Sequence, residues 1–384
     1  TFGLFIWFAL QILVFRKKIV FHIGDWVILF FFGTMIANAA IAHFNDGDLL
    51  KWLREYALLF LTLYYFPIRE YFSSKKDLKY LVGLLVLITV GASFYQFYSY
   101  YFAATSDEVA YAYQLAFGLR INQMFFTSAS LFGLVFAFGQ NKKTREWLLM
   151  IYTVLTFIGM FVSFSRTYWV FYFFSVILMF FYLSGNKKIL LLKYVGFVVA
   201  VMIIAILLFW RENAEAYLQV VSNRFTSSTK GTEDVSFIAR QVEYSAAFEQ
   251  IKRNPLGGNG LAREFSFHNP LAVYEKHTMV IHNGYIFFLY RLGLPLTLAY
   301  VFVLVYFTYK AFYLLSRVKS DMFLKNLILG SFISLLLVWA ANLTSSQFAY
   351  RDGIIVISLV YALIDIVERN INKTEEYEKK IEQH

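Results

Sequence analysis

The sequence predicts an all-α polytopic membrane protein of about eleven transmembrane helices with one large, mostly helical extracytoplasmic loop. Three observations predict this fold class. Hydrophobic residues make up 59% of the 384 positions and charged residues 16%, with a mean hydropathy of +0.56, which is more apolar surface than a soluble fold can bury. Apolar runs of about 20 residues, enough to span a hydrocarbon layer of about 30 Å, recur along the chain. Lysines and arginines cluster between these runs.

Each predicted helix is one apolar run between polar or turn-forming segments. The runs cover residues 1–15, 22–43, 50–68, 79–101, 121–139, 147–164, 167–184, 189–210, 284–308, 326–345 and 353–368. The chain has 4 prolines and no tract of alternating apolar and polar residues, so helices are expected to satisfy the backbone hydrogen bonds within the bilayer. Because the sequence begins inside an apolar run, part of the first helix or a whole preceding helix is expected to be missing, and a whole helix would bring the total to twelve.

The basic clusters predict how the helices are oriented. They lie at residues 16–18, 69–79, 142–145, 187–193, 310–325 and 369–380, at every second connection. Because positive residues are retained in cytoplasmic loops, these connections are predicted to be cytoplasmic. The chain then divides into helices in 1–210, an extracytoplasmic catalytic loop in 211–283, further helices in 284–368 and a cytoplasmic tail in 369–384. The formal charge of +10 therefore indicates orientation rather than a nucleic-acid partner.

The loop at residues 211–283 is long enough to predict structure of its own. Thr232-Glu233-Asp234 can cap a helix that runs to about Arg253, and the turn Asn254-Pro255-Leu256-Gly257-Gly258-Asn259-Gly260 then ends it. Arg240, Tyr244, Ala247 and Ile251 share one stripe of this helix. Arg240 is therefore expected to point in a defined direction, and the glycine-rich turn is interpreted as packing and helix termination.

Three segments on the predicted outer side carry chemically capable residues. They are Ser165-Arg166-Thr167-Tyr168-Trp169, the helix with Arg240, and His282-Asn283-Gly284 at the start of the ninth helix. In order and spacing they resemble the O-antigen ligase and O-antigen polymerase superfamily, whose fold is similar to that of C-type glycosyltransferases. The matching residues are Ser165 to Thr167, Arg240, Glu243, Ala247, Ile251, Asn254 to Gly260, His282, Asn283, Leu289 and Gly293.

The resemblance implies an enzyme of the bacterial inner membrane with its active site on the periplasmic side. Such enzymes transfer a glycan from a polyprenyl (undecaprenyl) diphosphate carrier to a sugar hydroxyl, without a metal and with inversion. The implied acceptor is lipid A-core or a growing glycan, and membrane lipids are the surrounding partners. An O-antigen ligase is the favoured interpretation, and a polymerase of the same superfamily is the alternative. A transporter or flippase of lipid-linked oligosaccharides is less favoured, because most spans lack central charges. A peptidoglycan polymerase is a third interpretation, but the acidic signature of that family is not seen in the outer loops.

The predicted catalytic residues are His282, Arg240 and Arg166. Arginine forks suit a diphosphate that gains charge as it leaves, and an imidazole suits removal of the hydroxyl proton. Each has a structural alternative. Arg166 could anchor a helix end at the headgroups, and Arg240 could form a surface pair with Glu243. His282 could be a helix-start residue bonded to a neighbour.

Further donor diphosphate-binding candidates are Arg120, Arg291 and Arg351. Arg120 and Arg351 are also ordinary interfacial arginines. Arg291 could line the donor cavity, or be paired structurally beside a local break at Gly293-Leu294-Pro295. No metal or other cofactor is expected: the chain has no cysteine, and the spacing of His268, His277 and His282 suits one helical face poorly.

Overall fold

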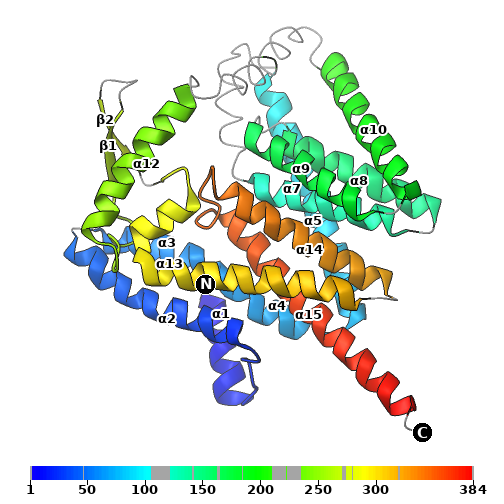
Figure 1. Cartoon of the computed structure of the whole chain (residues 1–384), viewed down its shortest axis with the longest axis horizontal. Helices are drawn as coiled ribbons and strands as arrows, with labels where there is room; N and C mark the ends of the chain where they lie inside the picture. The colour runs from blue at the N-terminus through cyan, green and yellow to red at the C-terminus, as the bar shows by residue number, and fades with distance from the viewer. Residues whose placement is uncertain are drawn as a thin grey trace. The chain divides into compact units, whose positions relative to one another are not determined.

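The structure of the chain is a computed structural model in which helices dominate (Figure 1). It describes residues 2–45, 47–104, 122–140, 142–161, 165–183, 185–209, 222, 235–269, 274–278, 280–318 and 321–382. The first half contains α1 (Phe2–Ala9), a π-helical turn (Leu10–Val14), α2 (Ile23–Phe44), α3 (Leu49–Leu59), a 3₁₀ segment (Phe60–Tyr64), α4 (Tyr65–Tyr71), α5 (Lys75–Ala104), α7 (Gln123–Phe138) and α8 (Lys143–Phe161). The second half contains α9 (Arg166–Tyr182), α10 (Gly185–Phe209), α12 (Val235–Arg253), β1 (Phe265–Asn269), β2 (Tyr274–Thr278), α13 (Gly284–Arg317), α14 (Met322–Ala341) and α15 (Arg351–Glu382).

The helical fold class is confirmed, because helices occupy every predicted apolar run. Four of the described helices are long and apolar enough to cross a membrane: Ile23–Phe44, Lys75–Ser99, Gly284–Arg317 and Met322–Ala341. Two shorter helices, Gln123–Phe138 and Thr167–Tyr182, are also apolar. The protein therefore has multiple candidate spans, and the number eleven stays a prediction.

The loop contains a small β-hairpin that the prediction of a mostly helical loop did not include. β1 and β2 pair antiparallel, with Phe265 opposite Thr278 and His268 opposite Glu275. Phe265 and Phe267 alternate along β1 and are both buried, as the two-residue period of a strand requires. The ring of Phe265 meets Tyr290 of α13 edge-on, with 5.5 Å between ring centroids, so the hairpin is anchored on a candidate span.

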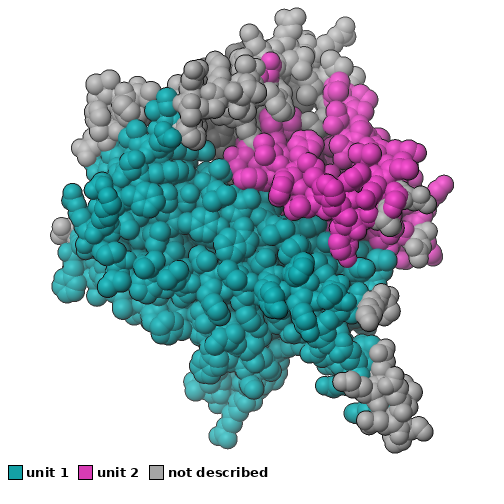
Figure 2. Space-filling model, viewed as in Figure 1, with its two compact units in different colours: residues 1–79, 235–384 teal, residues 80–234 magenta. Residues whose placement is uncertain are grey.

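The chain forms two compact units, residues 1–79 with 235–384 and residues 80–234 (Figure 2). In the first unit, α13 packs against α2, α14 and α15, and α15 packs against α4. Phe307 of α13 and Tyr361 of α15 stack in its core, with 4.0 Å between ring centroids.

The second unit joins its helices partly through buried hydroxyl groups. Thr89 bonds to Tyr152 at 2.9 Å, and Ser130 bonds to Tyr172 at 3.0 Å. Such bonds hold apolar helices together where lipid offers no hydrophobic driving force.

The glycine-rich turn after α12 docks on a break in α13. Gly293 has φ 75° and ψ 176°, a backbone conformation found almost only for glycine. At this break the amide of Asn259 donates to the carbonyl of Tyr290 at 2.8 Å, and the amide of Gly260 donates to that of Arg291 at 3.0 Å. The predicted local break and the packing role of the turn are therefore both confirmed.

Replacing Gly293 by alanine is expected to lower the free energy of unfolding by about 1–3 kcal/mol, the strain of a side chain in this region. A β-carbon there would also lie 2.0 Å from the carbonyl oxygen of Leu256. The matched control is Gly33→Ala on α2, where no atom lies within 4 Å of the added carbon. Denaturation of both variants in mixed micelles provides the test, and equal stability of the two would contradict the docking described here.

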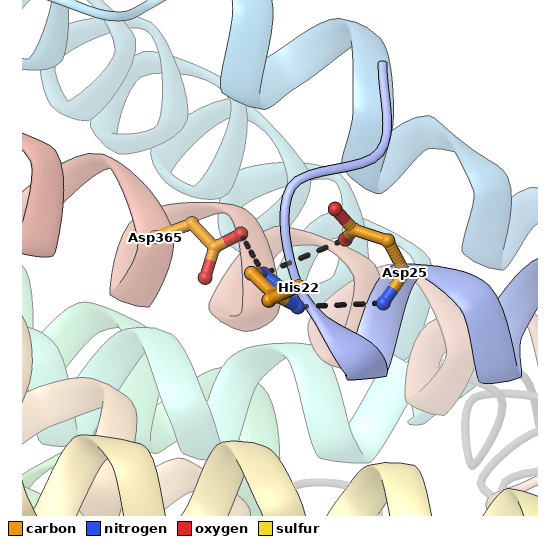
Figure 3. A group of neighbouring side chains, drawn as sticks. All are labelled: His22, Asp25 and Asp365. Carbon is orange, nitrogen blue, oxygen red and sulfur yellow. Dashed lines mark hydrogen bonds and ion pairs between the residues drawn. The ribbon is translucent and has the colours of Figure 1, made fainter. Parts of the chain in front are cut away.

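A buried charge network connects four helices of the first unit. The Arg69 Nη1 atom on α4 lies 2.8 Å from Asp25 of α2 and 2.9 Å from Asp365 of α15. Lys310 of α13 lies 2.7 Å from the other oxygen of Asp365, and His22 contacts the same carboxylate at 2.8 Å. Figure 3 shows the imidazole of His22 between the two aspartates. Arg69 and Lys310 belong to the basic clusters that were predicted to be cytoplasmic connections. In the structure, however, both are buried ionic partners and not exposed loop charges.

Candidate functional site

The candidate site centres on His282, which is paired with a buried carboxylate from α12. Glu243 is 3% exposed, and its Oε2 atom lies 2.9 Å from Nδ1 of His282. Its Oε1 atom accepts the backbone N–H of His282 at 3.0 Å. The imidazole side chain keeps 43% of its surface exposed, and in the described part of the chain only Nδ1 takes part in its hydrogen bonds. The imidazole thus keeps exposed surface beyond its contact with Glu243.

The backbone around His282 is fixed from two sides. Tyr244 of α12 donates to the carbonyl of His282 at 2.6 Å, and Ser346, in the connection between α14 and α15, donates to the carbonyl of Ile281. Burial raises the pKa of Tyr244 to about 12, so its phenol keeps the proton that it donates at neutral pH. The imidazole therefore occupies one position.

The next two residues start α13. The side chain of Asn283 caps the helix by accepting from the amides of Tyr285 and Ile286, both at 3.0 Å. The amide of Gly284 donates to the carbonyl of Asn342 at 2.8 Å, and a β-carbon on Gly284 would lie 1.9 Å from the Asn342 side chain. The prediction that His-Asn-Gly opens this helix is confirmed.

Arg240 lies one turn before Tyr244 on α12 and is half-buried. Its positive charge acts on the Tyr244 phenol, which also donates to the carbonyl of His282. The alternative prediction, a pair of Arg240 and Glu243 on the protein surface, is wrong, because the Glu243 carboxylate is buried and faces His282. α12 thus carries Glu243, which contacts His282, and Arg240, which lies near Tyr244.

Of the other predicted arginines Arg166, Arg120 and Arg351, only Arg351 has a described side chain. Arg166 is the first residue of α9, but its side chain lies outside the described residues, as does the whole of Arg120. Arg351 is exposed at the start of α15. Burial raises the pKa of the neighbouring Tyr350 phenol, and the charges of Asp352 and Glu243 raise it further. Arg351 therefore follows a tyrosine that lies near Glu243.

Arg291 is fully buried, and its guanidinium faces protein groups. Nη2 lies 3.9 Å from Glu55 of α3, and Nη1 lies 3.5 Å from the carbonyl of Gly260. The rings of Phe287 and Tyr290 lie 5.3 and 5.6 Å from it. These contacts support the structural alternative for Arg291, next to the break in α13.

Possible metal ligands gather elsewhere. Ligand atoms of His22, Asp25 and Asp365 lie within 4.8 Å of one another. The cationic groups of Arg69 and Lys310 already contact the two carboxylates, so the negative charge that a metal would need is neutralised by the protein. His268 and His277 lie on the β-hairpin, and His277 is exposed.

Sequence reasoning missed the role of Glu243, although one signal was present. Glu243 precedes Ala247 by four residues, so the two share a helix face, and Ala247 is fully buried. An acid on the buried face of a helix needs a polar partner. The partner, His282, lies 39 residues further along the chain, beyond what helical spacing can predict.

These features define a class of protein: a helical membrane protein with a carboxylate–imidazole pair at the start of an apolar span. Within that class, a family model described as O-antigen ligase matches residues 151–301, so this stretch carries an O-antigen ligase domain and the resemblance is confirmed. Members of this family are membrane-bound enzymes that transfer lipid-linked glycans. The match includes Arg166, Arg240, Glu243 and His282, and excludes Arg120 and Arg351. No curated protein matches the chain.

Proposed function

We propose that this protein is an O-antigen ligase that moves a glycan from undecaprenyl diphosphate to a sugar hydroxyl of lipid A-core. The observation that carries the proposal is the half-exposed imidazole of His282, held by the buried Glu243 where α13 begins. The family match supports the class of substrate. We propose that the site is on the periplasmic side of the bacterial inner membrane. The basic clusters occupy every second connection between the predicted helices, and segment 211–283 is one of the other connections.

The proposed reaction is a single displacement. Nε2 of His282 takes the proton of the acceptor hydroxyl, and the oxygen forms a bond to the anomeric carbon of the donor sugar. The bond between that carbon and the diphosphate oxygen breaks, and its electron pair leaves on the diphosphate. One displacement inverts the anomeric carbon. Because a diphosphate leaves readily, the proposal needs neither a general acid nor a metal.

Arginines would hold the leaving diphosphate. Arg240 is the best-supported of them, because α12 places it one turn from the tyrosine that contacts His282. We propose that Arg166, Arg120 and Arg351 add further positive charge around the phosphates. A planar guanidinium forms paired hydrogen bonds to phosphate oxygens that strengthen as negative charge develops.

The function is tested with the purified protein in proteoliposomes that contain an undecaprenyl diphosphate-linked glycan. A ligase forms lipid A-core that carries the glycan, and it leaves the donor unchanged when lipid A-core is omitted. A ladder of longer glycans on the carrier, without lipid A-core, would instead identify a polymerase. Transfer in the presence of EDTA should equal transfer without it. Movement of the donor across the bilayer without a new glycosidic bond would overturn the proposal.

Replacing Arg240 by alanine is expected to lower kcat/KM for transfer by about 10- to 100-fold, the effect of losing a charged hydrogen bond. Arg240→Lys should recover part of this loss, because lysine keeps the charge but not the paired geometry. The control is Arg253→Ala, an exposed arginine at the end of the same helix. If Arg240→Ala and Arg253→Ala have the same kcat/KM, Arg240 does not bind the donor.

A further inference from the structure

The pairing of Glu243 with His282 has a defined geometry at each carboxylate oxygen. Oε1 accepts the backbone N–H of His282 at 3.0 Å, and Oε2 faces Nδ1 at 2.9 Å. Both contacts come from one buried side chain. The carboxylate therefore holds the peptide and the ring of His282 together.

We propose that Glu243 is a positioning residue that selects the tautomer of His282 in which Nε2 is free to accept the acceptor's proton. An ionised carboxylate only accepts hydrogen bonds, so Nδ1 must carry the proton that faces it. The neutral imidazole then has its lone pair on Nε2, the nitrogen that makes no hydrogen bond in the described residues. This inference rests on the proposed function and adds to it the residue that prepares the base.

Glu243 also faces the charge that appears during the step. When Nε2 takes the hydroxyl proton, the imidazole becomes positive within 2.9 Å of a carboxylate with little access to water, where charges interact strongly. The charged and titratable groups around the pair are Arg240 and Tyr244 on α12, Tyr350 just before α15 and Asp352 in the first turn of α15. Glu243 is the one among them with a hydrogen bond to the ring in the described residues.

The isosteric variant Glu243→Gln separates tautomer selection from packing. The amide oxygen of glutamine can replace Oε1 and accept the His282 backbone N–H. Its NH₂ group then faces Nδ1, which must act as an acceptor, so the ring proton moves to Nε2. The shape of the site is preserved while the base is blocked, as with the carboxylate-to-amide change in a serine protease triad.

We expect Glu243→Gln to lower kcat roughly 10- to 100-fold with little change in KM, a smaller loss than removal of the base itself causes. Glu249→Gln is the matched control, because Glu249 is an exposed glutamate on the same helix. In the His282→Ala background, Glu243→Gln should have no further effect, because the two residues act through one group. Wild-type kcat in Glu243→Gln would overturn the inference.

The tautomer can be observed directly. Histidine-selective ¹⁵N labelling of the protein in proteoliposomes gives signals for 6 histidines, and His282→Asn identifies the signal of interest by its loss. Recorded at a pH where the ring is neutral, the wild type should show an unprotonated Nε2 and Glu243→Gln a protonated one. A wild type with its proton on Nε2 would overturn the inference without any variant of Glu243. Full activity of His282→Ala would overturn the proposed mechanism itself, which is a separate outcome.

Discussion

Replacing Arg69 by alanine is expected to lower the free energy of unfolding by about 3–5 kcal/mol, the usual effect of breaking a buried ion pair. Asp25 and Asp365 are 0% and 3% exposed, and both are bonded to Arg69. Without the guanidinium, two carboxylates would face each other in a site that water barely reaches. Lys310 and His22 would remain, but both are directed mainly at Asp365. The carboxylate left without a compensating positive charge should therefore be mainly that of Asp25.

The measurement is reversible denaturation in mixed micelles, compared with Lys252→Ala. Lys252 forms a pair with Glu249 in which both side chains are exposed, so its removal should change the free energy of unfolding by less than about 1 kcal/mol. A second variant, Asp25→Asn with Arg69→Met, removes both charges of one pair and should recover stability relative to Arg69→Ala. If Arg69→Ala is as stable as Lys252→Ala, the network does not hold the four helices together.

Replacing His282 by alanine is expected to lower kcat for glycan transfer by about 10²- to 10⁴-fold, the range that a general base contributes. Without the imidazole, the acceptor hydroxyl must lose its proton to water. KM should change little, because the proton moves only in the transition state. The buried Glu243 would lose its ring contact but keep the amide of residue 282 as a partner, so the fold should survive.

The control for this variant is His277→Ala, the same substitution at an exposed histidine of β2 in the same loop. Transfer rates of both variants are measured with saturating donor and acceptor, together with their unfolding midpoints. We expect His277→Ala to keep the rate of the wild type. Undiminished turnover of His282→Ala, in a folded protein, would remove His282 from the chemistry and leave the family match without an identified base.

The sequence predicts the helices well because hydropathy and helix formation act over the same local stretch. The 284 start of α13 and the 253 end of α12 agree with the prediction, since a capping asparagine and a proline–glycine turn mark them locally. Other ends differ: α8 begins at Lys143 and α15 continues to Glu382, beyond the predicted 147 and 368. Hydropathy measures the thickness of the apolar layer, whereas a helix continues into water as long as its backbone bonds are favourable.

The site was predicted less completely than the fold. Arg240 and His282 were identified because their local patterns are distinctive, and the structure brings both to Tyr244. The partner of His282 was not predicted, because Glu243 has a nearer cation at helical spacing and only the packing of α12 on α13 decides between them. Arg69 is a similar case. Its carboxylate partners lie 44 and 296 residues away, so composition alone marks it as one more basic residue at a membrane border.

The break in α13 makes the loop a structural part of this candidate span. The carbonyls of Tyr290 and Arg291 accept hydrogen bonds from the amides of Asn259 and Gly260. The glycine-rich turn therefore supplies donors that the next turn of an unbroken helix would supply. Excision of this turn would leave the carbonyl of Tyr290 without its donors from Asn259, at a cost of several kcal/mol inside an apolar helix. The carbonyl of Arg291 would keep only the side chain of Asn38 as a donor among the described residues. The hairpin, α12 and the first part of α13 should thus fold and unfold together, and a chimera that exchanges the loop must take α13 from the same parent protein.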